Sequence, residues 1–186
     1  MDTLRVLVVE DHRMVREMLC MTLQTEEGIE VVGEAGDGEE AISKARVLKP
    51  DLILMDIEMP VMTGIEACHE IRDRLPDCLV LMLTAKDDEE SFNYSLLAGA
   101  HGYVLKASGR EVLRRAIDAV RRGERFFDPP TILTLVNETI RILNERKQRL
   151  MEQLTPREVE VLRWIARGAT NREAAKEMGI AHQTVK

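Results

Sequence analysis

The first 125 residues alternate between short apolar runs and longer stretches with helical periodicity, and this alternation restricts the fold more than any other feature. Apolar runs predict five buried strands: Leu4–Val9, Glu30–Glu34, Leu52–Met55, Leu79–Leu83 and Gly102–Leu105. The predicted helices cover about Arg13–Gln24, Gly38–Leu48, Gly64–Arg74, Glu89–Ala98 and Arg110–Gly123. Five such units predict a flavodoxin-like, doubly wound α/β fold with a five-stranded parallel sheet between two layers of helices.

A change of pattern follows the fifth predicted helix. Asp128-Pro129-Pro130 breaks the alternation, so we place the end of the α/β domain at residue 128. Residues 129–152 then predict a linker helix, because Thr131–Met151 carries apolar residues on one face and charged residues on the other. This helix either packs on its neighbours or forms a dimeric coil, and two or three heptads do not decide between them.

Residues 153–186 predict a small, partial all-α domain. Thr155 to Glu158 and Thr170 to Glu173 are two capping boxes, each of which starts a helix that a glycine ends, at Gly168 and Gly179. A third helix begins near Gln183. Two short helices, a turn with glycine and a third helix make a helix-turn-helix arrangement.

The charge of the chain is unevenly distributed. The net charge is −7, with the acidic excess in residues 1–130 and a small basic excess in residues 131–186. Two modules with different partners are therefore expected, and the basic one is compatible with nucleic acid. Three widely spaced cysteines without a CxxC pair predict buried free thiols rather than a zinc site or a disulfide framework. No basic, apolar leader and no run near 20 apolar residues are present, so we expect a soluble, cytoplasmic protein without membrane contact.

Polar residues follow four of the predicted strands, where parallel strands present their carboxyl ends to one edge. They are Glu10 and Asp11, Asp56, Thr84 and Lys106. Because ligands of open α/β sheets bind beyond this edge, these residues are expected to form one site. Clustered carboxylates need a countercharge, for which Mg²⁺ is the natural cation. An aspartate nucleophile, a lysine that neutralises charge and a hydroxyl donor suit phosphoryl chemistry.

Several motifs resemble those of response-regulator receiver domains. They are Val-Val-Glu10-Asp11-His12, Leu-Met-Asp56-Ile-Glu-Met-Pro60 with Gly64, Leu-Thr84-Ala85, and Ala-Gly-Ala-His-Gly-Tyr103-Val-Leu-Lys106. The resemblance covers about residues 3–125, with Ala107 where many receivers have proline.

This resemblance implies a role for each site residue. Asp56 is the phosphoacceptor, and the Mg²⁺ ligands are Glu10, Asp11, Asp56 and the carbonyl of Glu58. Thr84 and Lys106 bind the phosphoryl group, while Thr84 and Tyr103 form the switch pair. From the spacing we add the hypothesis that Glu58 and Lys86 form an ion pair that hinders hydrolysis of the phosphorylated state.

Residues 154–186 resemble the LuxR-type helix-turn-helix, so the whole chain is similar to the NarL/LuxR subfamily of response regulators. The resemblance implies that the third helix enters the major groove, and the DNA-facing candidates are Lys176, Thr184, Val185 and Lys186. Ala181 stands where the family usually has a capping serine, whose loss costs about 1 kcal/mol of helix stability. The chain ends inside the predicted third helix, so we expect an incomplete domain and assign DNA binding to the parent protein.

The sequence thus predicts a two-component response regulator and transcription factor that is not an enzyme. A sensor histidine kinase phosphorylates Asp56 with Mg²⁺, and the phosphorylated protein forms a homodimer that binds promoter DNA. One alternative is a Mg²⁺-dependent phosphohydrolase with an aspartyl nucleophile, for which Glu58 is the second acid but the usual following Thr or Val is missing. The other is a phosphorylation-independent scaffold, against which the complete set of site residues argues.

Overall fold

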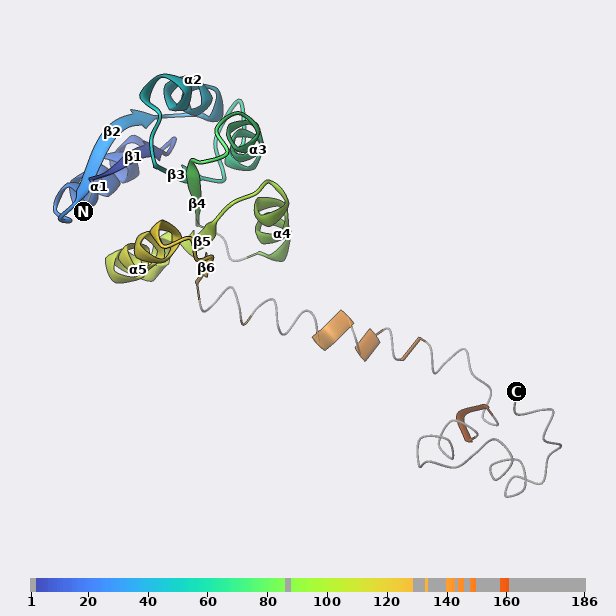
Figure 1. Cartoon of the computed structure of the whole chain (residues 1–186). Coiled ribbons are helices and arrows are strands. Elements are labelled where there is room, and N and C mark those ends of the chain that lie inside the picture. Colours follow the sequence, from blue (N-terminus) through green and yellow to red (C-terminus); the bar gives the residue numbers. More distant parts are fainter. Residues whose placement is uncertain are drawn as a thin grey trace. The chain divides into compact units, whose positions relative to one another are not determined.

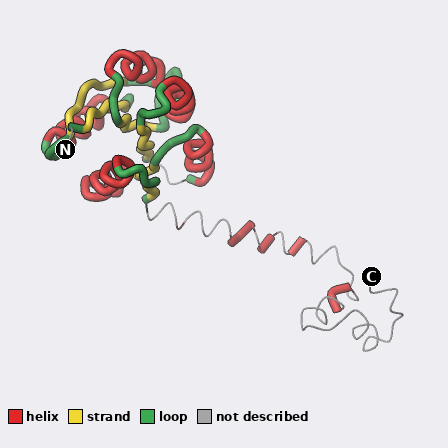
Figure 2. Tube along the Cα trace, viewed as in Figure 1, coloured by secondary structure: helices red, strands yellow, loops and turns green. Residues whose placement is uncertain are grey.

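The computed structural model describes residues 3–85 and 88–128, with residues 133, 140–142, 144–145, 148–149 and 158–160 as helical fragments (Figures 1 and 2). The chain divides into two compact units, Met1–Leu135 and Val136–Lys186. The domain bounds 1–128, 129–152 and 153–186 stay predictions. Lys86, Ala181 and the four DNA-facing candidates lie outside the described residues.

A parallel sheet forms the centre of the first unit, with the strand order β2-β1-β3-β4-β5-β6. The strands are β1 (Leu4–Val9), β2 (Ile29–Ala35), β3 (Leu52–Asp56), β4 (Leu79–Thr84), β5 (Gly102–Leu105) and β6 (Phe126–Phe127). The five predicted strands and their flavodoxin-like order are confirmed. The sixth strand was not predicted, because two residues are too short for a hydrophobic period.

Helices cover both faces of this sheet (Figure 1). They are α1 (Arg13–Gln24), α2 (Gly38–Leu48), α3 (Gly64–Arg74), α4 (Glu89–Leu97) and α5 (Gly109–Arg121), with a 3₁₀ turn, η1 (Lys106–Ser108), before α5. The prediction that α5 continues to Gly123 is wrong by two residues. Gly123 has a φ of +79°, and such a left-handed residue cannot continue a right-handed helix.

Alternation along each strand divides the core into two layers. Ile53 and Met55 of β3 face α2, α3 and α4, whereas Leu52 and Leu54 face α1 and α5. Every residue of β3 is buried. A strand that is covered on both faces therefore has to be apolar along its whole length, and its first polar side chain, Asp56, comes at its end.

Side-chain caps fix where two helices, α2 and α3, begin on the face of the sheet toward which Ile53 and Met55 point. Asp37 accepts a hydrogen bond from the backbone N–H of Glu40 at 2.8 Å at the start of α2. Thr63 and Glu66 form a reciprocal capping box at the start of α3, with backbone-to-side-chain bonds of 2.9 and 3.3 Å. Both caps satisfy backbone donors that a helix leaves unpaired, so the loops from β2 and β3 enter their helices at fixed points.

The three cysteines are free and buried, as the sequence predicts. Burial raises the pKa of the Cys68 and Cys78 thiols to about 12. Thiols with such a pKa stay protonated near neutral pH and are poor nucleophiles. None of the helices in the described part of the chain is long and apolar enough to cross a membrane.

Candidate functional site

The predicted polar residues all lie at the carboxyl edge of the sheet. Glu10 directly follows β1, Asp56 and Thr84 end β3 and β4, and Lys106 directly follows β5. Glu10, Asp56 and Thr84 are almost completely buried. The order of the strands explains why these polar residues cluster. Strands β1, β3, β4 and β5 are neighbours that run in the same direction, so their last residues lie at one edge of the sheet.

Lys106 joins two of the buried carboxylates. Its Nζ lies 2.8 Å from Asp56 Oδ2 and 2.7 Å from Glu10 Oε2. Burial lowers the pKa of Lys106, but its close contacts with the carboxylates of Asp56 and Glu10 and their charges outweigh burial and raise it. Burial also raises the pKa of Asp56, and the Glu10 charge adds to this effect while Lys106 opposes it. The Lys106 ammonium thus offsets the repulsion between the two neighbouring buried carboxylates and part of the cost of burying their charges.

The acidic residues still carry more negative charge than Lys106 neutralises. Glu10, Asp11 and His12 each place one ligand atom within 4.8 Å of the others. Glu10 Oε2 is buried and accepts no hydrogen bond of regular geometry from the described residues, although the Lys106 ammonium lies beside it. Carboxylate oxygens in excess of the available cations are the ligands that a hard divalent cation such as Mg²⁺ prefers. The residues present therefore fit the predicted metal.

The loop from β3 to α3 packs directly against Asp56. A Cβ atom on Gly64 would lie 1.8 Å from the carbonyl oxygen of Asp56, so only glycine fits. The N–H of Gly64 donates to the carbonyl of Ile57 at 3.0 Å. Val61 in the same loop has a φ of +69°, a strained conformation for a β-branched residue. The loop that carries Glu58 is therefore tightly folded beside the predicted phosphoacceptor.

Aromatic rings surround the predicted switch residue Tyr103, which is buried. The ring of Phe92 in α4 packs edge to face against Tyr103 and against Phe127 of β6, with centroids 5.3 and 5.2 Å apart. In this state Tyr103 is part of the core between β5 and α4. Any rearrangement of Tyr103 therefore disturbs its contact with Phe92 of α4, which in turn contacts Phe127 of β6.

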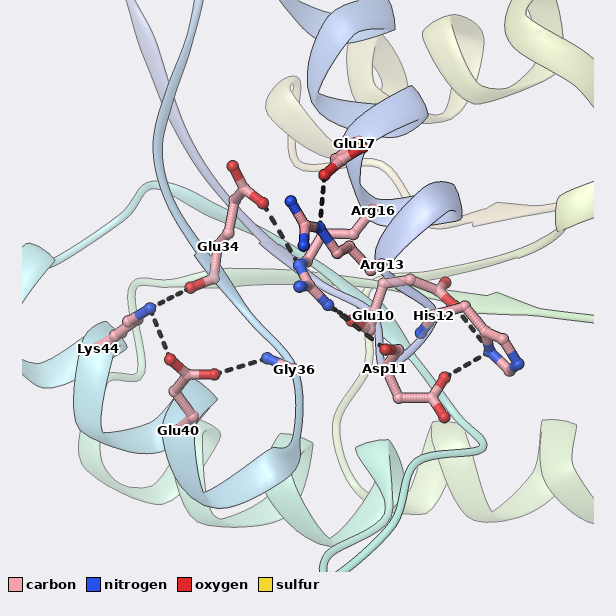
Figure 3. A network of polar contacts seen from close by, with 10 residues as sticks. All are labelled: Glu10, Asp11, His12, Arg13, Arg16, Glu17, Glu34, Gly36, Glu40 and Lys44. Carbon is pink, nitrogen blue, oxygen red and sulfur yellow. Dashed lines mark hydrogen bonds and ion pairs between the residues drawn. The ribbon is translucent and has the colours of Figure 1, made fainter.

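The sequence did not predict that three further residues, His12, Arg16 and Asp128, contact the residues of this site. His12 Nδ1 lies 2.7 Å from Asp11 Oδ1, and Arg16 donates to the backbone carbonyl of Glu10 (Figure 3). Asp128, which the sequence marked only as a break, is buried and accepts hydrogen bonds from the Leu105 N–H and the Ser108 hydroxyl. His12 next to two acids was a visible signal, whereas the contacts of Arg16 and Asp128 depend on tertiary structure.

Comparison with known proteins agrees with this geometry. Residues 6–118 match the response regulator receiver domain, and residues 152–186 match the bacterial regulatory proteins of the luxR family. The chain belongs to the response-regulator family. Its combination of a receiver and a LuxR-type DNA-binding domain is that of the NarL/LuxR subfamily, whose members are transcription factors and typically not enzymes.

Relatives extend over nearly the whole chain. The response regulator protein VraR of Staphylococcus aureus (strain NCTC 8325 / PS 47) is 41% identical over 184 residues, which are 99% of this chain and 86% of VraR. A LuxR-family response regulator from Aurantimonas sp. SI85-9A1 covers 75% of this chain and 99% of its own, with 33% identity and a TM-score of 0.72. RcsB of Salmonella typhimurium covers 100% and 88%, with 25% identity and a TM-score of 0.65, and another RcsB structure holds two dimers bound to two parallel DNAs.

Proposed function

We propose that this response regulator is switched by Mg²⁺-dependent phosphorylation of Asp56. The observation that carries the proposal is the Lys106 ammonium within 2.8 Å of Asp56 and 2.7 Å of Glu10 at the carboxyl edge of the sheet. This arrangement supports the proposal because a carboxylate that could act as a nucleophile lies beside a cation and close to a second carboxylate. The phosphodonor is a sensor histidine kinase or a small acyl phosphate.

The transfer needs an ionised Asp56. One carboxylate oxygen attacks the phosphorus of the donor, a P–O bond forms, and the bond to the donor nitrogen or oxygen breaks with its electron pair leaving on the donor. The Lys106 ammonium stabilises the ionised carboxylate and then the charge of the phosphoryl oxygens. Thr84 supplies a hydroxyl that donates to one of these oxygens.

Four groups are the proposed holders of Mg²⁺: the carboxylates of Glu10, Asp11 and Asp56 and the backbone carbonyl of Glu58. The bound ion neutralises carboxylates and phosphoryl oxygens, so an anionic donor can approach an anionic site. Lys106 alone leaves this excess charge uncompensated. Removal of divalent cations with a chelator is therefore expected to abolish phosphorylation.

The switch is proposed to run through Thr84 and Tyr103. A phosphoryl group on Asp56 adds charge beside Lys106 and draws the Thr84 hydroxyl toward it. Tyr103 then repacks against Phe92 and Phe127, which alters the face formed by α4, β5 and α5. This population shift between two receiver states favours a homodimer, and the dimer presents paired LuxR-type domains to promoter DNA in the cytoplasm.

Sedimentation velocity tests the link between phosphorylation and assembly. The full chain, incubated with acetyl phosphate and Mg²⁺, is expected to shift from monomer to dimer, whereas Asp56→Ala stays a monomer under the same conditions. Omission of Mg²⁺ serves as the second control. A dimer that forms equally in Asp56→Ala, or without acetyl phosphate, contradicts the proposal and supports a phosphorylation-independent scaffold.

A further inference from the structure

The guanidinium of Arg16 in α1 lies between Glu34 and the backbone of Glu10 and Asp11 (Figure 3). Its Nη1 donates to the backbone carbonyl of Glu10 at 2.5 Å and lies 3.5 Å from the carbonyl of Asp11. The side chain is only 19% exposed, which is unusual for a charged residue on a helix surface. One guanidinium thus holds the main chain of two consecutive predicted metal ligands.

The other side of the Arg16 guanidinium is fixed by β2. Its Nε lies 3.3 Å from Glu34 Oε2. The backbone carbonyl of Glu34 accepts a hydrogen bond from Lys44 of α2 at 2.5 Å, and Lys44 pairs with Glu40 at 2.7 Å. Glu40 in turn accepts from the N–H of Gly36 at 2.7 Å. The loop after β1 is therefore connected through Arg16 to the loop after β2.

We propose that Arg16 is a positioning residue for the divalent cation, which rests on the proposed function of this site. A planar guanidinium with several donors in fixed directions binds two carbonyl oxygens in a way that a lysine ammonium cannot. By fixing the backbone of Glu10 and Asp11, it holds their carboxylates in place before the ion arrives. Its positive charge also lowers the repulsion between these two acids in the empty site.

A general structural role predicts a different result from a positioning role. The apolar residues Leu19, Cys20 and Leu23 already attach α1 to the sheet. Arg13, one turn earlier on the same helix, is a matched control: its 83% exposed side chain pairs with Glu17 at 2.8 Å. Removal of Arg13 deletes a positive charge of α1 and an ion pair, but leaves the contact with the Glu10 and Asp11 carbonyls intact.

The test is direct titration of the full chain with Mn²⁺, followed by electron paramagnetic resonance of the free ion. Mn²⁺ is the probe because it shares the preference of Mg²⁺ for carboxylate oxygens. Asp11→Asn defines the background from other acidic groups. Arg16→Ala is expected to raise the Kd about tenfold, as removal of residues behind metal ligands commonly does. Arg16→Lys is expected to raise it less, and Arg13→Ala to leave it unchanged.

A second readout separates positioning from loss of structure. Phosphorylation of Arg16→Ala by acetyl phosphate is expected to need about tenfold more Mg²⁺ for half its maximum, but to reach the wild-type extent at saturating Mg²⁺. If Arg16→Ala shows no cooperative unfolding transition, the Kd of Arg16→Lys decides instead.

Two outcomes overturn the role of Arg16. One is a Kd of Arg16→Ala for Mn²⁺ that equals the Kd of Arg13→Ala. The other is phosphorylation of Arg16→Ala that saturating Mg²⁺ does not restore. The proposed function fails separately, if the wild-type chain binds Mn²⁺ but is never phosphorylated at Asp56.

Discussion

The two sides of the acidic site are built from different interactions. On the side of β1, β2 and α2, Arg16 donates to the backbone carbonyl of Glu10, which follows β1, and pairs with Glu34. Lys44 extends this network through its contacts with Glu34 and Glu40. On the side of β4, β5 and α4, the ring of Phe92 packs edge to face against the rings of Tyr103 and Phe127. We call these the polar side and the aromatic side of the site.

This difference separates a part that has to be fixed from a part that has to move. Hydrogen bonds have narrow preferences in distance and angle, so the polar side is suited to hold the predicted metal ligands in one arrangement. Apolar burial has little directional preference, so rings on the aromatic side can repack without losing most of their contact area. A phosphorylation switch needs both, because a metal site loses affinity when its ligands move whereas a switch has to change shape.

The largest expected effect is the removal of Phe92. Phe92→Ala deletes the ring that contacts both Tyr103 and Phe127 and leaves a cavity, which is expected to cost about 3–5 kcal/mol of unfolding free energy. Urea denaturation measures this loss. In the variant that stays folded, Mn²⁺ affinity is expected to remain near the wild-type value, because the polar side is untouched. A Kd that rises together with the loss of stability contradicts the separation of the two sides.

A smaller but more local effect is expected at Gly64. In Gly64→Ala the new Cβ would lie 1.8 Å from the Asp56 carbonyl, so the loop has to shift at a cost of about 3 kcal/mol. Because the shift displaces Asp56 and Glu58, phosphorylation by acetyl phosphate is expected to fall with stability. Gly36→Ala is the control, since its Cβ would meet atoms only at 3.7 Å. Equal effects of the two substitutions would show that the close approach at Asp56 is unimportant.

Acid is expected to loosen the aromatic side through His101, and a variant that does not titrate separates this effect from protonation elsewhere. His101 stands just before β5, and its Nδ1 accepts a hydrogen bond from the Val80 N–H at 3.1 Å. Burial, and then the charges of Arg72 and Arg125, lower the pKa of His101 to about 4. The unfolded chain therefore binds a proton more readily between pH 6.5 and about 4, and stability falls as the pH falls through this window.

The expected loss from His101 is about 1–2 kcal/mol at the lower end of the window, because solvent screens a ring that is only half-buried. Urea denaturation at a series of pH values measures it, and His101→Asn, which keeps an acceptor but does not titrate, is expected to flatten the curve in this range. Hydrogen exchange is expected to show that amides of β5 open before those of β1. Parallel curves for the two proteins contradict the half-buried, neutral state of His101.

The sequence predicted the position of the site residues more fully than the residues that hold them in place. Glu10, Asp56, Thr84 and Lys106 could be placed because each comes at the end of an apolar run, and parallel strands bring those ends together. Arg16 gave no comparable signal, since an arginine on an amphipathic helix usually lies in solvent. Its partners at Glu10 and Asp11 are backbone carbonyls, which every residue has, so the sequence does not mark them. Asp128 and Phe127 were missed because β6 is only two residues long. The roles of the site residues remain predictions.

The most direct test of the central claim is the intact mass of the full chain after incubation with acetyl phosphate, with and without Mg²⁺. We expect the wild-type chain to gain the mass of one phosphoryl group only when Mg²⁺ is present, and Asp56→Ala to gain none. The same adduct on Asp56→Ala, or no adduct on a wild-type chain that binds Mn²⁺, would contradict Asp56 as the phosphoacceptor.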